Sequence, residues 1–294
     1  MKKVIAVIVT YNRKELLKES IEALLNQDYE KCDILIVDNA STDGTEEYIK
    51  GLLDGNKVKY VNTGANLGGA GGFNFGMKEA CKIGCDFIWL MDDDCIVHKD
   101  TLTKLIDYDK ELKGEYGFLA SKVLWRDGTI CRMNIPRRTL TKNVENFENS
   151  MQSIVMASFV SLLVKTEVIK EEGLPIKDFF IWTDDWEYTR RISRKYKCYL
   201  INESVVTHKS KNNIGANIAN DSEDRLDRYK YLYRNDVYLY KREGIKGWGY
   251  LIPRLFVHIL RVIFSKQKGK IKKIKIIIAS TISGIKFNPQ IENV

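Results

Sequence analysis

Residues 87–94 read FIWLMDDD, an apolar run that ends abruptly in three aspartates. Five large apolar residues in succession predict a buried strand. Three carboxylates at the end of such a strand are too costly to bury without partners. Because side chains alternate along a strand, Asp92 and Asp94 should point to one side and Asp93 to the other. Two carboxylates on one side suit a hard divalent cation that carries phosphates, whereas an acidic turn after a core strand is the plainer alternative.

Strands and helices alternate on either side of this stretch in the first hundred residues. Short β-branched runs predict three more strands, at residues 4–9, 32–37 and 58–61. Helices are predicted at residues 14–27, 45–53 and 73–83, the last after a glycine-rich loop at 66–72. A repeated strand–helix order predicts an α/β fold of Rossmann-like type, a mostly parallel central sheet with helices on both faces.

The remainder of the chain has a weaker pattern. Further helices are predicted at residues 101–112, 184–195 and 224–241, and further strands at 118–125, 156–165 and 199–206. Residues 137–150 show little periodicity and are predicted to form a loop. From Trp248 onward the sequence is amphipathic and rich in lysine. We therefore expect an α/β domain at residues 1–222 and a C-terminal helical, basic region at 223–294.

Bulk composition limits the class of protein. The 294 residues are 44% hydrophobic, and their net charge of +8 would attract an anionic partner: a nucleotide, a nucleic acid or an acidic lipid surface. The six cysteines lack zinc-type spacing, so we expect reduced thiols in a cytosolic setting. The apolar run at the N-terminus is too short for a signal peptide, and no run approaches the length of a membrane-spanning helix.

Polar residues follow four of the predicted elements. They are residues 10–13 (TYNR), Asp38 with Asn39, the glycine-rich loop, and the three aspartates. The carboxyl ends of parallel strands lie along one edge of a sheet, so these groups should meet there. Hydrogen-bonding side chains, backbone amides and a metal position suit a phosphate-bearing ligand. The glycine-rich loop matches neither a P-loop nor a dinucleotide fingerprint, and alone it is equally compatible with a flexible turn.

A second acidic centre lies at residues 182–188, WTDDWEY. Asp184 and Glu187 have the spacing of a capping box that begins a helix. That reading leaves Asp185 unexplained in the first turn, beside two tryptophans. The helix N-terminus would keep such a carboxylate ionised, as a general base requires. Trp182 and Trp186 suit the wall of a sugar subsite, although a purely capping role for the acidic pair stays open.

His208 ends the strand predicted at residues 199–206. A lone histidine is most often an ordinary surface or core residue. An imidazole nevertheless completes many oxygen-rich metal sites that contain two aspartates. His208 is therefore a candidate third ligand for the metal expected at Asp92 and Asp94.

These motifs together resemble the inverting nucleotide-sugar glycosyltransferases of family 2, which have the GT-A fold. The resemblance covers roughly residues 1–210. It rests on the opening strand (VIVTYNR, 7–13), a nucleobase-binding segment (VDNASTDGT, 37–45), an Asp-x-Asp motif (92–94) and an acidic motif that activates the acceptor (DDWEY, 184–188). The glycine-rich segment NLGGAGGF, at residues 66–73, resembles the galactofuranosyltransferase and rhamnosyltransferase branch.

The resemblance implies a role for each candidate residue. The nucleotide would be bound by Thr10, Tyr11, Asn12, Arg13, Asp38, Asn66 and Gly69. Mn²⁺ or Mg²⁺ would be held by Asp92, Asp94 and His208. The donor sugar would lie beside Asp93 and Asp184, and the acceptor beside Trp182, Trp186 and Glu187. Asp185 would remove the proton from the acceptor hydroxyl.

The function implied is a metal-dependent inverting transfer of galactofuranose from UDP-galactofuranose to a lipid-linked or polysaccharide glycan of the cell wall. A rhamnosyltransferase that uses dTDP-rhamnose is the first alternative, and a sugar-phosphate nucleotidyltransferase is a more distant one. We expect the protein to lack the extra N-terminal domain of the long galactofuranosyl polymerases, which would favour the addition of one or a few sugars.

The basic tail suggests where such an enzyme would work. An apolar helix face combined with a lysine cluster suits the anionic inner face of the cell membrane, where a lipid-diphosphate-linked acceptor would be found. We therefore expect a cytoplasmic protein bound peripherally to that membrane. A helical pair packed on the catalytic domain is the alternative. We expect no binding to nucleic acid, because the aspartate clusters would repel a phosphate backbone, and the oligomeric state stays open.

Overall fold

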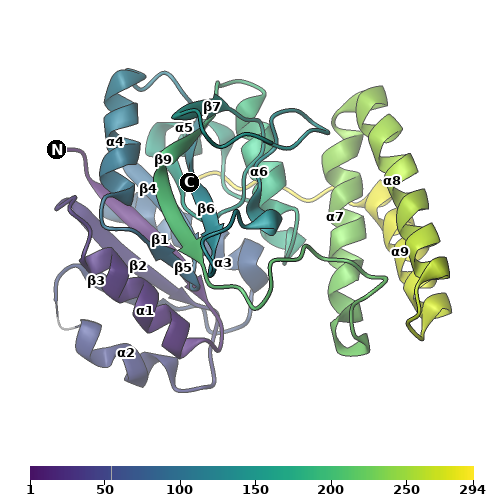
Figure 1. Ribbon diagram of the computed structural model, residues 1–294. Coiled ribbons are helices and arrows are strands. Elements are labelled where there is room, and N and C mark those ends of the chain that lie inside the picture. The colour runs from purple at the N-terminus through teal and green to yellow at the C-terminus, as the bar shows by residue number, and fades with distance from the viewer. Residues whose placement is uncertain (54) are drawn as a thin grey trace.

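The computed structural model describes residues 1–53 and 55–294, and in these residues nine strands form one mixed sheet (Figure 1). The strands are β1 (Val4–Thr10), β2 (Cys32–Asp38), β3 (Val58–Asn62), β4 (Phe87–Asp92), β5 (Cys95–Val97), β6 (Phe118–Trp125), β7 (Met151–Ser153), β8 (Leu162–Lys165) and β9 (Tyr199–His208). The helices are α1 (Lys14–Leu25), α2 (Thr45–Leu53), α3 (Gly68–Ile83), α4 (Thr101–Glu111), α5 (Thr166–Glu172), α6 (Asp184–Ser193), α7 (Tyr229–Lys241), α8 (Gly244–Phe264) and α9 (Lys270–Lys286).

The strand order is β3-β2-β1-β4-β8-β6-β9-β5, with β7 paired to β9. The first four strands are parallel, so their carboxyl ends share one edge, where Thr10 pairs with Asp38 and Val9 with Asp92. β8 runs antiparallel to both β4 and β6, while β6 and β9 are parallel. The α/β prediction, with a mostly parallel sheet, is confirmed.

Both faces of the sheet are covered, as the continuous apolar strands predict. Alternate residues of β1 enter two different cores: Val4, Ala6 and Ile8 pack with α1 and α4, and Ile5 and Val7 pack with α3, α5 and α6. The sheet therefore forms the middle layer of a three-layer domain, and its polar edge stays open for a site.

Helix α3 begins earlier than the sequence predicts. It starts at Gly68 rather than at Phe73, so the glycine-rich segment is its first turn and not a loop. Glycine has a low helix propensity, which explains the error. Packing outweighs it, because Gly72 lies against Val9, and Gly76 lies against Val7 and Val37, with no room for a Cβ atom. The glycines thus let α3 lie directly on the sheet.

The second half of the chain departs from prediction in several places. Only Leu162–Lys165 of the predicted strand 156–165 is a strand, and β5 and α5 were not expected. Residues 137–150 lack a helix or a long strand, as predicted. The predicted helix 224–241 is a 3₁₀ segment, Glu223–Arg228, followed by α7. All six cysteines have free thiols.

The three C-terminal helices form a layer beside the sheet domain, with α7 nearest to it (Figure 1). Glu243, the N-cap of α8, pairs with Arg190 of α6 and with Arg194, the C-cap of α6. Near the end of the chain, the carbonyl of Glu292 accepts a hydrogen bond from Leu174 N. These contacts fix the layer to the sheet domain, and the domain boundary at 222/223 stays a prediction.

Helix α8 corrects one expectation. It is 21 residues long and, by length and composition, apolar enough to cross a membrane, although no run in the sequence was expected to reach that length. The difference arises because α8 tolerates Pro253 and two arginines within one continuous helix, and these interrupt the apolar run when the sequence is read alone.

Candidate active site

The carboxyl ends of β1, β2 and β4 bring the predicted nucleotide-binding residues together. The Thr10 hydroxyl donates to Asp93 at 2.7 Å. Asp38 accepts from Ser41 N at 2.8 Å and from the Tyr60 hydroxyl at 2.6 Å. Buried Asp38 therefore orders the turn after β2 as well as lining the edge.

Two further predicted nucleotide-binding residues shape neighbouring backbone. Asn12 Oδ1 accepts from Thr42 N at 2.7 Å, which ties the turn after β1 to the turn after β2. Asn66 Oδ1 accepts from Gly68 N at 2.9 Å, at the start of α3. Tyr11 is exposed and Gly69 lies in the first turn of α3. Their contact with a nucleotide stays a prediction.

Asp92, Asp94 and His208 form a compact group of candidate metal ligands. One ligand atom from each lies within 4.8 Å of the others. The pairing of β5 with β9 sets Cys95 opposite His208, which brings the imidazole to the aspartates. His208 Nε2 lies 2.9 Å from Asp94 Oδ1. Two carboxylates and an imidazole are a suitable donor set for Mn²⁺ or Mg²⁺.

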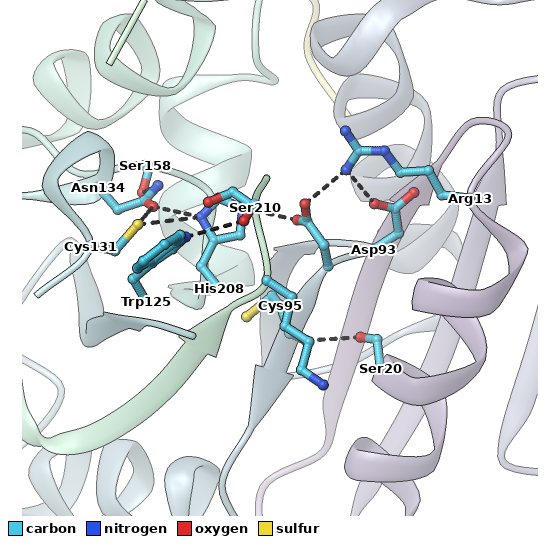
Figure 2. Close-up of polar contacts among 12 residues, drawn as sticks. Arg13, Ser20, Asp93, Cys95, Trp125, Cys131, Asn134, Ser158, His208 and Ser210 are labelled. Carbon is cyan, nitrogen blue, oxygen red and sulfur yellow. Dashed lines mark hydrogen bonds and ion pairs between the residues drawn. The ribbon is translucent and has the colours of Figure 1, made fainter. Parts of the chain in front are cut away.

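Asn134 orients this histidine, as Figure 2 shows. The Asn134 amide nitrogen donates to Ser158 Oγ at 3.0 Å, so its oxygen faces His208 Nδ1 at 2.7 Å. That oxygen can only accept, so Nδ1 keeps its proton and Nε2 is directed at the aspartates. The sequence offered no signal for Asn134, because the contact joins residues 74 positions apart.

The electrostatics of the group favour a cation. Burial raises the pKa of Asp92 to about 6, and the charge of Asp94 adds to this effect. Burial is the largest single influence on Asp94 and opposes its ionisation, but the hydrogen bond with His208 and the charges of His208 and Arg13 together lower its pKa. The imidazole, in turn, is held charged by Asp94 despite burial, with a pKa of about 10. Asp92 is thus a buried carboxyl that resists ionisation beside a second, ionised carboxylate, and a divalent cation would relieve that repulsion.

Arg13 and Asp93 lie beside these ligands (Figure 2). Arg13 Nη1 contacts Asp93 at 3.2 Å and Asp94 at 2.8 Å. Burial raises the pKa of Asp93 to about 7, with Arg13 opposing the rise. Asp93 faces Thr10, whereas Asp92 and Asp94 gather with His208. β4 ends at Asp92 and the next two aspartates lie in a turn, so strand alternation is not what separates them.

Asp184 and Asp185 begin α6, and the predicted capping box does not form. The N-cap is Thr183, which makes no side-chain cap because its hydroxyl donates to Asp236 of α7 at 3.0 Å. Asp185 Oδ1 instead accepts from Trp186 N at 2.7 Å. The acidic pair therefore lies at the helix start, with its carboxylates available for other partners.

Burial strongly affects both carboxyls. It raises the pKa of Asp185 well above its usual range, and the charges of Asp184 and Asp92 raise it further. It also raises the pKa of Asp184 to about 7. The helix N-terminus alone therefore does not keep Asp185 ionised, contrary to the sequence argument. A positive charge bound at Asp92 and Asp94 would lower the pKa of Asp185 and so favour the ionised, basic form of this carboxyl.

The remaining predicted acceptor residues divide into two groups. Trp182 packs on Tyr229 at a ring-centroid distance of 5.1 Å, and the Arg137 guanidinium lies 4.3 Å from the centroid of the Trp186 ring. Both tryptophans are half-buried. Glu187 is 2% exposed and pairs with Arg191 at 3.1 Å. The structure thus gives Glu187 a structural partner and does not bring it to the surface of the site.

The parallel sheet with an Asp-x-Asp cluster at its carboxyl edge defines the class: a glycosyltransferase with the GT-A fold. The family model described as glycosyl transferase family 2 matches residues 5–159. The chain belongs to this family.

Relatives and solved structures agree with this assignment. The galactofuranosyltransferase GlfT1 of Mycolicibacterium smegmatis is 26% identical over 285 residues, or 85% of this chain and 90% of the relative. The poly(ribitol-phosphate) beta-N-acetylglucosaminyltransferase TarP of Staphylococcus aureus is 24% identical over 296 residues, or 92% of this chain and 84% of the relative.

Two solved structures show the fold. S. aureus TarS 1–349 in complex with UDP-GlcNAc has a TM-score of 0.56 at 15% identity, over 96% of this chain and 72% of that one. The mannosyltransferase PcManGT of Pyrobaculum calidifontis, in complex with GDP-Man and Mn²⁺, has a TM-score of 0.59 at 14% identity, over 98% and 76%.

Proposed function

We propose that this protein is a metal-dependent inverting glycosyltransferase that takes its sugar from a nucleoside diphosphate donor. The observation that carries the proposal is the convergence of Asp92, Asp94 and His208 within 4.8 Å, with Asp185 near enough for Asp92 to raise its pKa. One side of the site suits the leaving diphosphate, and the other offers a base. PcManGT, which shares the fold and is in complex with Mn²⁺, supports the metal assignment.

The chain's own residues define the chemistry. Asp92, Asp94 and His208 would hold Mn²⁺ or Mg²⁺, which supplies charge neutralisation of the departing diphosphate when bound. Asp185 accepts the proton of the acceptor hydroxyl while the oxygen of that hydroxyl forms a bond to the anomeric carbon of the donor sugar. The bond between that carbon and the diphosphate oxygen breaks on the opposite face. The configuration therefore inverts, and no covalent intermediate forms.

UDP-galactofuranose is the donor that we propose. Similarity to GlfT1 over 85% of the chain supports it, together with the glycine-rich first turn of α3. Similarity to TarP favours N-acetylglucosamine as a second candidate, and dTDP-rhamnose stays an alternative. The family match weighs against a sugar-phosphate nucleotidyltransferase. The acceptor that we propose is a lipid-diphosphate-linked or polysaccharide glycan.

A donor panel tests this proposal. Purified protein with Mn²⁺ and a lipid-diphosphate-linked glycan receives UDP-galactofuranose, dTDP-rhamnose, UDP-N-acetylglucosamine, UDP-galactopyranose or UDP-glucose, and nucleoside diphosphate release is measured. We expect UDP-galactofuranose to give the highest kcat/KM. Preference for any other donor overturns the sugar assignment, and no transfer from any of them counts against the activity itself.

The base assignment has its own matched control. Asp185→Asn should lower kcat by at least about a thousandfold, because the proton acceptor is lost, while UDP binding in Mn²⁺ is retained. Asp107→Asn alters an exposed carboxylate on α4 and should leave kcat unchanged. An active Asp185→Asn enzyme would remove Asp185 from the mechanism.

We also propose that the outer faces of α8 and α9 lie on the anionic cytoplasmic surface of the membrane. Apolar side chains are exposed along one face of α8: Ile252, Phe256, Val257, Leu260, Ile263 and Phe264. A similar series follows on α9: Ile271, Ile278, Ile282 and Ile285. Two adjacent helices with exposed aromatic and branched side chains form an interaction face rather than scattered surface residues.

Charge supports a lipid surface as the occupant of this face. A groove of about 740 Å³ between α7 and α9 is lined by four cations, Lys230, Arg234, Lys272 and Lys275. These charges complement anionic lipid headgroups. The ion pair of half-buried Arg254 with buried Asp236, at 2.8 Å, fixes the inner face of α8 to α7. A helix that crossed the bilayer would have to leave this pair, so surface binding is favoured over spanning.

A further inference from the structure

Residues 180–183, directly before α6, have a backbone that few side chains tolerate. The φ angles of Phe180, Trp182 and Thr183 are 63°, 65° and 68°, in the left-handed region that favours glycine. A bulky or β-branched residue in this region is uncommon and strained. Such a conformation persists only where the surrounding structure holds it, and it concentrates at functional sites. Other parts of the structure must therefore hold residues 180–183 in this conformation.

Helix α7 supplies the first set of contacts. The buried Asn235 amide nitrogen lies 3.0 Å from the carbonyl oxygen of Phe179, 3.2 Å from that of Ile181 and 2.9 Å from that of Trp182. The two hydrogens of one amide group are therefore shared among three carbonyl oxygens of the same turn. Asn235 is fully buried, so water cannot replace these bonds without opening the interface.

The next residue of α7 supplies a second contact. Asp236 Oδ1 accepts from the Thr183 hydroxyl at 3.0 Å, and its other oxygen pairs with Arg254 of α8 at 2.8 Å. Asp236 is 3% exposed, and the arginine satisfies its buried charge. Thr183 is the N-cap of α6, so this bond fixes the point from which Asp184 and Asp185 project.

We propose that Asn235 and Asp236 are positioning residues for Asp185: they hold segment 180–183 in its strained form and so aim the carboxylate at the acceptor. The inference rests on the proposed function of Asp185. Both residues lie outside residues 5–159, the part that the family model matches. Helix α7 then belongs to the catalytic apparatus of this chain, although it contributes no group that touches the reacting atoms.

A neighbouring contact separates positioning from simple packing. Glu243 pairs with Arg190 of α6 at 2.7 Å and with Arg194, the C-cap of α6, at 2.5 Å. It joins the C-terminal helices to α6 but does not contact residues 180–183. Weakening this contact should loosen the interface without moving the start of α6. Glu243→Gln is therefore the control for a purely structural effect.

Thr183→Val is the decisive variant. Valine keeps the shape and the β-branch of threonine. It replaces the hydroxyl, which donates a hydrogen bond to Asp236, with a methyl group. We expect kcat to fall by about tenfold to a hundredfold, as small misplacements of a reacting group produce, with the KM for the donor within about twofold of wild type. Thr183→Ser restores the hydroxyl and should recover most of the kcat. Asn235→Asp replaces the donating amide and should behave like Thr183→Val.

Three outcomes would overturn the proposal. They are a wild-type kcat in Thr183→Val, an equal fall in kcat in Glu243→Gln, and a fall in Thr183→Val that serine does not recover. We expect Glu243→Gln to lower the melting temperature and leave kcat unchanged. If Asn235→Asp does not fold, Thr183→Val and Thr183→Ser still decide the question.

A measurement without turnover keeps this inference distinct from the proposed function. Hydrogen exchange of the amides in residues 180–187 should be at least about tenfold faster in Thr183→Val than in wild type or Thr183→Ser, with exchange in α3 unchanged. Unchanged exchange refutes the holding role, whatever the donor. Faster exchange with no transfer by the wild-type protein would instead count against the proposed function alone.

Discussion

Gly68 joins two parts of the site that lie more than a hundred residues apart in sequence. Its φ is 71°, and an added Cβ atom would collide with the carbonyl oxygen of Phe180. The same oxygen accepts a hydrogen bond from Ala70 N at 3.1 Å. The start of α3 and the strained segment before α6 are therefore in direct contact, and only glycine fits at the closest point.

Gly68→Ala should destabilise the protein by about 2 kcal/mol or more, because alanine meets both the left-handed backbone and the collision. Its neighbour provides the control. Gly69 has open space at its Cβ position, so Gly69→Ala should change the free energy of unfolding by less than about 1 kcal/mol. Urea unfolding measures both, and equal effects would show that the contact with Phe180 is not tight.

Asn134 yields a prediction about the metal site. Asn134→Ala removes the acceptor that fixes His208 Nδ1, so we expect a tenfold to a hundredfold loss of Mn²⁺ affinity, roughly the usual cost of losing such a partner. His208→Ala should cost at least as much. Calorimetric titration of the protein with Mn²⁺ in the presence of UDP measures the change. Wild-type affinity in both variants would place the metal elsewhere.

At the residue scale, the polar residues at the ends of predicted strands indicated much of this site. An apolar strand that ends in three aspartates pointed to Asp92 and Asp94, and the family resemblance added His208, which the structure places beside them. Asn134 and Asn235 were not predictable, because a single polar residue in an irregular or helical segment carries no periodic signal. Their partners lie 74 and more than 50 positions away.

At the scale of elements, the sequence pattern located the long strands and missed the short ones. β6 spans Phe118–Trp125, as predicted. The three-residue strand β5 was missed because so short a run has no pattern, yet its pairing with β9 delivers His208 to the site. The sequence predicted the start of α3 five residues too late, because helix propensity does not include the close packing of Gly72 on the sheet.

The packing of α7 on α8 predicts a pH dependence of stability. Burial lowers the pKa of His258 to about 4, and Arg254 and Arg261 add to the effect. The unfolded chain, with a usual pKa of about 6.5, binds a proton below that pH that the folded protein does not bind until about pH 4. Stability should therefore fall as pH drops from 6.5 to 4.

The size of this effect follows from the two pKa values. The folded protein should lose about 2 kcal/mol between pH 7 and pH 5 through His258 alone. Urea unfolding at both pH values measures the loss. His258→Phe, which cannot titrate, should reduce the loss by that amount, and an unchanged loss in this variant would show that His258 is not buried as a neutral group.

At the scale of the whole molecule, the family match and the candidate site cover different parts of the chain. The match ends at residue 159, whereas Asp185, His208 and the α7 contacts follow it. The fold was predictable because its strands repeat a local pattern. The role of the C-terminal layer was not, because its inner face is recognised only from its contacts with residues 179–183.

Membrane binding is a property of the whole molecule, and we expect it to need both charge and apolar surface. The intact protein should bind vesicles of mixed phosphatidylglycerol and phosphatidylcholine and not vesicles of phosphatidylcholine alone. Phe256→Ser with Phe264→Ser, or Lys272→Glu with Lys275→Glu, should weaken sedimentation with the mixed vesicles at least about tenfold.

A charge-matched pair elsewhere controls this experiment. Lys31→Glu with Lys99→Glu changes exposed lysines on the sheet domain and should have little effect on binding. If the intact protein does not bind the mixed vesicles, the membrane role is wrong. If it resists alkaline extraction from cell membranes, α8 spans the bilayer instead of lying on it.

The contact between Ala70 and Phe180 has a kinetic consequence. The first turn of α3 belongs to the half of the site proposed for the nucleotide, and Phe180 begins the segment that presents the proton acceptor. A ligand that binds against the first turn of α3 should therefore also stabilise the segment that begins at Phe180. We therefore expect compulsory order: the donor enters first, its arrival completes the acceptor subsite, and the spent nucleotide leaves last.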